Sequence, residues 1–176
     1  MNQLEIIHRK IFSEEGLIRQ LCRWRLTDNK IVFTNGCFDL MHAGHIDYLS
    51  KARDLGDVLI VAVNSDNSVK SLNKGIARPI QSFESRSLIM ASLHFVDAIV
   101  EFDDETPLRL IELIKPDVLV KGGDYDVGEL NSSKKSYIVG SNEVRGYQGK
   151  VLTIPFVEGY STSAIEMKIL NSLKGG

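Results

Sequence analysis

Short apolar runs alternate along the chain with stretches in which apolar residues recur at helical spacing. The segment Val58–Val63 is apolar at every position, which is typical of a strand buried on both faces of a parallel sheet. Shorter runs predict further strands at Ile31–Thr34, Ala98–Val100, Val118–Val120 and Val151–Ile154. Helices are predicted between and after them, over 46–55, 82–95, 107–114 and from 163 onward. The alternation predicts the α/β class, with a Rossmann-like parallel sheet that carries helices on both faces.

The first 28 residues are predicted to form a helical arm ahead of a single α/β domain at residues 29–176. Ser13 can cap a helix, and the apolar residues that follow it fall on one helical face: Leu17, Ile18, Leu21 and Trp24. Earlier in the arm, four apolar side chains could pack across a subunit interface: Ile6, Ile7, Ile11 and Phe12. We therefore expect a homo-oligomer, namely a dimer.

Composition narrows the class of protein. A length of 176 residues with 43% hydrophobic and 25% charged residues is typical of one globular core. The net charge of −2 predicts no general attraction to nucleic acid or to an anionic membrane. No apolar run approaches the roughly 20 residues that span a bilayer, and the first ten residues lack a signal-peptide core. Cys22 and Cys37 lack the spacing of metal ligands, so we expect a protein of the reducing cytoplasm.

Candidate chemistry lies just after the first core strand, because ligands of parallel α/β sheets bind beyond the strand carboxyl ends. Gly36 allows a sharp turn there, and Gly44 lies between His42 and His45 where the next helix should begin. The unpaired N–H groups at a helix start attract phosphate, and both imidazoles can face the same anion. The pattern therefore favours a phosphate site.

Other interpretations of this turn stay open at the level of the residues. The histidines could be ordinary hydrogen-bonded turn residues, or they could bind a metal together with Asp39. Cys37 could act as a nucleophile. Two familiar phosphate motifs are missing, because the sequence holds neither a G-x-x-x-x-G-K-[ST] loop nor a G-x-G-x-x-G turn after a strand.

Later segments offer further candidates for the same ligand. Lys74 lies in a basic loop and could bind a triphosphate, whereas Arg86 could reach the same phosphates or form a structural ion pair. After the strand at Val118–Val120, Gly123 allows close backbone approach and Asp124 could accept ribose hydroxyls.

The start of the last predicted helix offers hydroxyl groups. Ser163 and Glu166 have the spacing of a capping box, which leaves Ser161 and Thr162 as free hydroxyls at a second helix N-terminus. Two helix starts and a lysine that converge on one crevice would suit a polyphosphate.

The segment from Asn35 to Asp39, followed by His42-Ala43-Gly44-His45, resembles the H-x-G-H nucleotidyltransferase superfamily, which includes the cytidylyltransferases. The segments 48–69, 75–80, 116–125, 138–144 and 151–163 look like the adenylyltransferases of ADP-heptose synthesis. The resemblance implies that residues 29–176 form a nucleotidyltransferase domain. Such a domain transfers AMP from ATP to D-glycero-β-D-manno-heptose 1-phosphate, giving ADP-heptose and pyrophosphate for lipopolysaccharide core synthesis.

The resemblance also implies roles for individual residues. Catalytic roles would belong to His42, His45 and Lys74, and Asn64 and Asp66 would bind the sugar phosphate. The nucleotide would contact Asn35, Gly36, Cys37, Phe38, Asp39, His42, Gly44, His45, Lys74, Arg86, Gly123, Asp124, Tyr160, Ser161, Thr162 and Ser163. Mg²⁺ would accompany ATP without a dedicated protein metal site, and Asp39 would orient either the turn or that ion.

Two alternatives to this function are a cytidylyltransferase that acts on a polyol or amino-alcohol phosphate, and a nucleotide-binding sensor domain without activity. The polar segment Asp126–Tyr137 is longer than the resemblance leads us to expect. It could be a substrate lid, a dimer contact or a surface loop.

Overall fold

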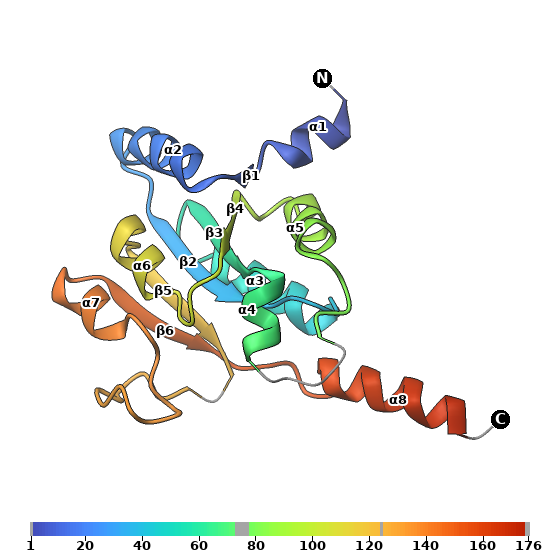
Figure 1. Cartoon of the computed structure of the whole chain (residues 1–176). Helices are drawn as coiled ribbons and strands as arrows, with labels where there is room; N and C mark the ends of the chain where they lie inside the picture. Colours follow the sequence, from blue (N-terminus) through green and yellow to red (C-terminus); the bar gives the residue numbers. More distant parts are fainter. Residues whose placement is uncertain (1, 73–77, 124, 175–176) are drawn as a thin grey trace.

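A single parallel sheet organises the structure, a computed structural model that describes residues 2–72, 78–123 and 125–174 (Figure 1). The strand order is β1-β4-β3-β2-β5-β6, and every neighbouring pair is parallel. The strands are β1 (Ile11–Phe12), β2 (Ile31–Gly36), β3 (Val58–Asn64), β4 (Ala98–Phe102), β5 (Val118–Gly122) and β6 (Lys150–Ile154). The predicted α/β class and Rossmann-like parallel sheet are confirmed.

Helices cover both faces of the sheet because strand residues point alternately to either side. Along β3, Ile60 belongs to one apolar cluster, whereas Leu59 and Val61 belong to the other. The first cluster also contains side chains of α2 (Glu14–Leu26), α6 (Leu108–Ile114) and α7 (Ser141–Gly146). The second contains side chains of α3 (Ala43–Arg53) and α5 (Phe83–Ser92). All seven residues of β3 are buried, as its continuous apolar run predicts.

Side-chain caps define several helix starts. Ser13 accepts a hydrogen bond from the Gly16 amide at 3.2 Å, which confirms the predicted cap of α2. Ser82 caps α5 in the same way. A short helix, α4 (Asp66–Ser71), follows β3 and is capped by Ser65. The helix after His42 begins at Ala43, so Gly44 lies in its first turn as expected.

The predicted helical arm is two helices joined by a strand. Helix α1 (Gln3–His8) leads into β1, and β1 pairs with β4 at the edge of the sheet. Ile7 and Ile11 pack against one apolar cluster of the chain itself, and Phe12 packs against the other. These three side chains are therefore used within the chain, whereas Ile6 is 41% exposed. The boundary at residue 28 stays a prediction.

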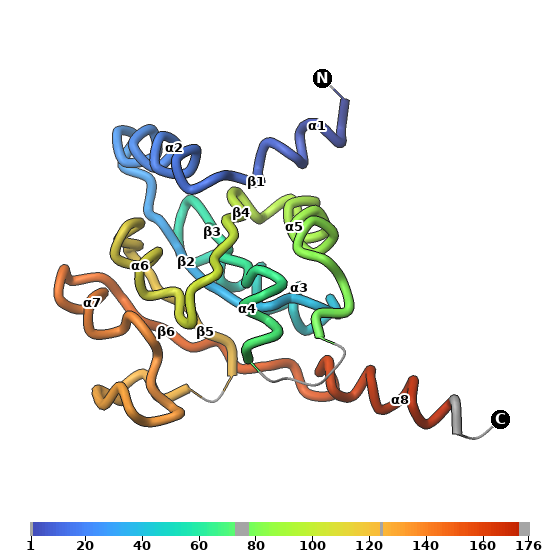
Figure 2. Tube along the Cα trace, viewed as in Figure 1, coloured from blue at the N-terminus to red at the C-terminus, as the bar shows by residue number. Residues whose placement is uncertain are grey.

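The C-terminal helix α8 (Thr162–Lys174) extends away from the body of the molecule (Figure 1). Figure 2 follows the chain from β6 to this helix. Here Tyr160 lies so close to Gly44 that a Cβ atom on that glycine would be 3.0 Å from the tyrosine Cβ. Among the described helices, none combines the length and apolar character needed to cross a membrane.

Hydrogen exchange can test whether the N-terminal segment belongs to the sheet. The Ile99 amide donates to the Lys10 carbonyl oxygen at 2.7 Å, so its exchange should be slow in the intact protein. The substitution Phe12→Asp places a charge against Trp24 and should speed exchange at Ile99, while Ile60 in the central strand stays protected. Fast exchange at Ile99 in the unaltered protein would contradict the pairing of β1 with β4.

Candidate active site

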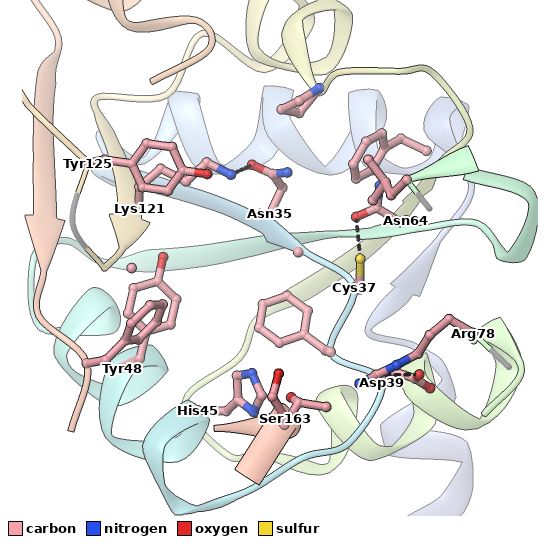
Figure 3. A pocket seen from close by; sticks show the side chains of 18 of the residues that line it. Asn35, Cys37, Asp39, His45, Tyr48, Asn64, Arg78, Lys121, Tyr125 and Ser163 are labelled. Carbon is pink, nitrogen blue, oxygen red and sulfur yellow. Dashed lines mark hydrogen bonds and ion pairs between the residues drawn. The ribbon is translucent and has the colours of Figure 1, made fainter. Parts of the chain in front are cut away.

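A cavity of about 870 Å³ opens at the carboxyl ends of the central strands (Figure 3). From β2 the chain proceeds to β3 and β4 on one side, and it then crosses back to β5 on the other side of β2, so the direction of winding reverses beside β2. This is the switch point at which open α/β sheets bind ligands. The lining of the cavity includes residues at or after the ends of β2, β3, β4, β5 and β6, together with residues of α3 and of the first turns of α8.

The turn after β2 is held in shape by Asp39. This residue is 3% exposed, and its carboxylate accepts hydrogen bonds from the backbone amides of Ile80 and Gln81, both at 2.9 Å. Arg78 adds an ion pair at 2.8 Å. Burial alone would raise the pKa of Asp39, but the hydrogen bonds from Gln81, Ile80 and Arg78 outweigh burial and lower that pKa. The carboxylate therefore stays charged and its oxygens are already engaged.

Two residues of this turn have unusual backbone requirements. Phe38 has φ of +49°, in the left-handed region that non-glycine residues rarely adopt. Its ring lies over Gly36, where a Cβ atom would come within 3.0 Å of a ring carbon. Gly36 therefore allows Phe38 to fold back over the strand end, and Phe38 in turn contacts His45 with ring centroids 5.5 Å apart.

His42 and His45 are stacked at the start of α3, with ring centroids 3.9 Å apart and planes inclined by 25°. Gly44 makes room for this arrangement, because a Cβ atom there would lie 3.1 Å from the His42 ring. The Nδ1 atoms of both histidines are buried, and neither has a hydrogen-bond partner among the described residues. The structure thus brings together the two imidazoles that the sequence singled out, and it leaves a polar atom of each unsatisfied.

Burial keeps both imidazoles uncharged at neutral pH. It lowers the pKa of His42, and burial together with the neighbouring His42 lowers the pKa of His45 to about 4. A neutral imidazole still carries one N–H group that can donate to a phosphate oxygen. An anion that binds here would favour protonation and raise both pKa values.

Arg86 is buried beneath the turn after β2. Its side chain is 0% exposed, and its guanidinium donates to the carbonyl oxygens of Gln81, Cys37 and Asn64 at 2.7–3.0 Å. It also forms an ion pair with Asp66 at 2.7 Å. The guanidinium is therefore engaged by oxygens of the protein. Of the two roles left open for Arg86, the structure contains the structural ion pair. Asp66, predicted to bind the sugar phosphate, is engaged in the same ion pair.

A second polar group lies at the end of β5. Lys121 donates to the side-chain oxygen of Asn35 at 2.6 Å, and its ammonium lies 5.9 Å from the centre of the Tyr125 ring. Figure 3 shows these three side chains in a part of the cavity away from His45 and Ser163. A Cβ atom on Gly123, which has φ of +102°, would lie 2.5 Å from the Phe156 ring. Phe156 therefore packs closely against Gly123, and the approach of a ligand to this glycine stays a prediction.

The start of α8 differs from the predicted capping box. Ser161, not Ser163, accepts the capping hydrogen bond, from the Ala164 amide at 3.0 Å. Glu166 pairs with Arg78 at 2.6 Å instead of closing the box. The exchange of roles turns Thr162 and Ser163 toward the cavity, which both of them line.

Most of the predicted site residues meet at this cavity. Those that line it are Asn35, Gly36, Cys37, Phe38, Asp39, His45, Asn64, Thr162 and Ser163. Three further predicted residues lie next to this lining: His42, Gly44 and Tyr160. The His42 ring stacks on His45 and also on Tyr160, with centroids 6.3 Å apart in the second pair, and Gly44 lies against both His42 and Tyr160. Lys74 and Asp124 lie outside the described residues. The roles of all these side chains as ligands stay predictions.

Several cavity residues were missed by the sequence analysis. They are Tyr48, Arg78, Lys121, Tyr125, Lys135, Phe156 and Glu166. Tyr48 bridges Thr34 and the Val120 carbonyl, and its burial raises the pKa of its hydroxyl. Arg78 follows Lys74 by four residues in the basic loop, so its charge could have marked it as a candidate. Lys135 lies in the polar segment 126–137, part of which therefore reaches the cavity.

Residues 33–168 match the cytidylyltransferase-like family over most of the chain. The chain belongs to this family. The match spans the histidine turn, the ends of β3 and β5, and the start of α8, so each segment that lines the cavity lies within it.

Two relatives of this cytidylyltransferase-like chain are much longer proteins. It is 48% identical to the bifunctional protein HldE of Koribacter versatilis over 91% of this chain and 31% of that protein. It is 50% identical to the protein of the same name from Wolinella succinogenes, over 93% of this chain and 32% of that one. The chain thus spans about a third of the length of these relatives.

Solved structures confirm the fold. A lipopolysaccharide core biosynthesis protein from Thermoplasma volcanium has a TM-score of 0.57 and 27% identity, covering 76% of this chain and 99% of that one. Pantoate-beta-alanine ligase from Francisella tularensis has a TM-score of 0.54 and 17% identity, covering 90% of this chain and 76% of that one. The second likeness concerns the fold alone.

Metal binding by the histidine turn was one of the open interpretations. Within residues 2–72, 78–123 and 125–174, no three side chains of the His, Cys, Asp and Glu types are grouped so that they could hold an ion. Asp39, the expected third ligand, has its carboxylate oxygens engaged by Arg78, Ile80 and Gln81.

The low pKa of His45 predicts that acid destabilises the fold. The unfolded chain takes up a proton at this residue near pH 6.5 but the folded chain only near pH 4, so the free energy of unfolding should fall as the pH falls between these values. One such proton contributes a slope of at most about 1.4 kcal/mol per pH unit. Urea unfolding over this pH range should show a steeper slope for the unaltered protein than for His45→Gln, and equal slopes would contradict the assignment.

Proposed function

We propose that this chain transfers AMP from ATP to D-glycero-β-D-manno-heptose 1-phosphate, releasing pyrophosphate and ADP-heptose for lipopolysaccharide core synthesis. The observation that carries the transferase chemistry is the stacked pair His42 and His45, with its unsatisfied ring nitrogens, beside a cavity at the switch point of the sheet. Membership of the cytidylyltransferase-like family supports the same chemistry. The choice of acceptor rests on the relatives named HldE and on the neighbour named for lipopolysaccharide core biosynthesis.

The reaction needs alignment and charge neutralisation more than it needs a base. A phosphate oxygen of the sugar phosphate is already anionic at neutral pH and attacks the α-phosphorus of ATP. One P–O bond forms there as the bond to the β-phosphate oxygen breaks, and pyrophosphate carries away the electron pair. Holding the two reactants in line and placing donors at the developing charge lowers the barrier.

Each described group has a proposed part in this step. His42 and His45 donate N–H groups to the oxygens of the α- and β-phosphates, together with the amides at the start of α3. Thr162 and Ser163, at the start of α8, donate hydroxyl groups to the departing phosphates. Lys74, which lies outside the described residues, is proposed to bind the same phosphates.

Mg²⁺ is expected to accompany ATP, but Asp39 does not fit as its ligand. Both carboxylate oxygens already accept hydrogen bonds from backbone amides, and one is paired with Arg78. Of the two roles predicted for Asp39, we therefore propose that it orients the turn. The phosphates and water would supply the ligands of the ion, as is common for Mg²⁺.

We also propose that the protein acts in the cytoplasm and as a dimer. Both substrates are phosphorylated metabolites, which are made inside the cell. The proposed dimer contact now rests on the exposed apolar residues Leu4 and Ile6 of α1, because Ile7, Ile11 and Phe12 pack within the chain. Analytical ultracentrifugation of the unaltered protein and of Ile6→Asp tests this, and a monomer in both would contradict it.

A panel of substrates tests the proposed reaction. Pyrophosphate release should require ATP and the heptose 1-phosphate, and CTP should not replace ATP. Turnover with CTP and a polyol phosphate instead would assign the chain to the alternative cytidylyltransferase reaction. Nucleotide binding without turnover on any acceptor would favour a sensor domain.

Removal of one imidazole tests the histidine pair. His45→Ala should lower kcat by about 100-fold or more, on the scale of losing one oxyanion donor. His94→Ala is the matched control, because His94 is exposed and contacts only the neighbouring Phe95 ring among the interactions recorded for it. Near-normal turnover in a folded His45→Ala protein would refute the assignment.

A single methyl group tests the geometry of the pair. In Gly44→Ala the new Cβ would lie 3.0 Å from Tyr160 and 3.1 Å from His42, so the His42 ring must shift by a few tenths of an ångström. We expect turnover to fall by about tenfold, because small misplacements of positioned groups are costly. Gly146→Ala is the control, since a Cβ atom there meets nothing within 4 Å. Equal turnover in the two variants would show that the spacing of the pair is unimportant.

A further inference from the structure

Arg78 lies in the cavity and is held between two carboxylates. Its Nη1 atom is 2.8 Å from Asp39, and its Nη2 atom is 2.6 Å from Glu166 on α8. The side chain is 12% exposed, and Figure 3 shows it beside Asp39. Its Nε atom is buried and has no hydrogen-bond partner among the described residues. A guanidinium with one unsatisfied N–H group in a candidate phosphate cavity needs a physical explanation.

The two carboxylates hold Arg78 in different ways. The side chain of Asp39 is 2% exposed, and two backbone amides fix its position. The side chain of Glu166 is 35% exposed and lies on the helix that extends from the body of the molecule. Asp39 is therefore a permanent partner of Arg78, whereas Glu166 can leave without exposing a buried charge.

The geometry of the guanidinium shows which edge is incompletely used. The Nε–H group and one N–H of Nη2 point the same way and form a fork that matches two oxygens of one phosphate. Glu166 forms its ion pair at Nη2, whereas the Nε–H group has no hydrogen-bond partner among the described residues. A phosphate group could satisfy both arms together.

We propose that Arg78 is a phosphate-binding residue that the free protein holds in reserve, with Glu166 as an exchangeable counter-ion. A substrate phosphate displaces the Glu166 carboxylate and takes both arms of the fork, while Asp39 keeps the guanidinium in place. The displacement also releases the contact that Glu166 makes from α8, one turn beyond Ser163. The inference rests on the proposed function only in that the substrates carry phosphates, which come from ATP, the sugar phosphate or both.

Binding measurements separate this role from a purely structural ion pair. Glu166→Gln removes a competing charge from the cavity, so calorimetry should show at least about threefold tighter binding of a non-hydrolysable ATP analogue, of the sugar 1-phosphate, or of both. Arg78→Ala should weaken the same binding by about tenfold or more, also in the Glu166→Gln background. Arg78→Lys keeps the charge but loses the fork, so its affinity for the ligand should lie between that of the unaltered protein and that of Arg78→Ala. Which ligand responds identifies the phosphate that Arg78 takes.

Controls keep the test independent of folding and of turnover. Glu14→Gln removes a carboxylate from another arginine pair, at 2.9 Å from Arg109 and outside the cavity lining, and should leave both affinities unchanged. If Arg78→Ala does not fold, Glu166→Gln and Arg78→Lys still decide the question. Unchanged or weaker binding of both ligands to folded Glu166→Gln would overturn the exchange. Absent turnover on the heptose phosphate with the affinity changes intact would instead reject the proposed acceptor alone.

Discussion

The buried guanidinium of Arg86 holds the site together. It donates to backbone carbonyls of the turn after β2, the end of β3 and the start of α5, and its charge is balanced by Asp66 at the start of α4. An isolated charge at 0% exposure would be very costly, and this arrangement is stable because each of the three guanidinium nitrogens donates to a protein oxygen. The histidine turn is thus fixed from beneath by a side chain that is buried below the cavity surface. Three chain segments keep their spacing through one residue.

Above this support, the site is organised so that the groups closest to the proposed reaction carry no charge until a ligand arrives. His42 and His45 are neutral because burial and mutual proximity disfavour their protonated forms. Two imidazolium rings stacked at 3.9 Å would repel each other, so neutral rings are what permit the stacking. The cations Arg78 and Lys121 are meanwhile engaged with Asp39, Glu166 and Asn35. A polyphosphate would enter a cavity whose donors are already oriented, which reduces the reorganisation needed at the moment of reaction.

The two arginines show how a residue type can be predicted while its role is not. For Arg86, one turn into a helix after the basic loop, the sequence left phosphate contact and a structural ion pair open, and its buried guanidinium donates to protein oxygens beneath the turn. Arg78 belongs to the loop itself and lines the cavity. The two arginines differ in the number of backbone carbonyl groups near the guanidinium, which depends on how β2, β3 and α5 pack against one another. The order of residues along the chain does not reveal this packing.

Local signals along the sequence determined the parallel α/β fold, the histidine turn and nine of the residues that line the cavity. Alternating apolar periods specify strands and helices, and Gly36, Gly44 and the two histidines act within a few residues of one another. Only the tertiary structure decided that Ile11 and Phe12 join the sheet, that Ser161 and not Ser163 caps α8, and that Arg78 pairs with Glu166. Each of these depends on contacts between segments distant in sequence, or on a choice between near-equal local hydrogen bonds that packing settles. Pattern and propensity act over one or two turns of chain, whereas the partner of a buried charge is selected by whichever segments the fold brings beside it.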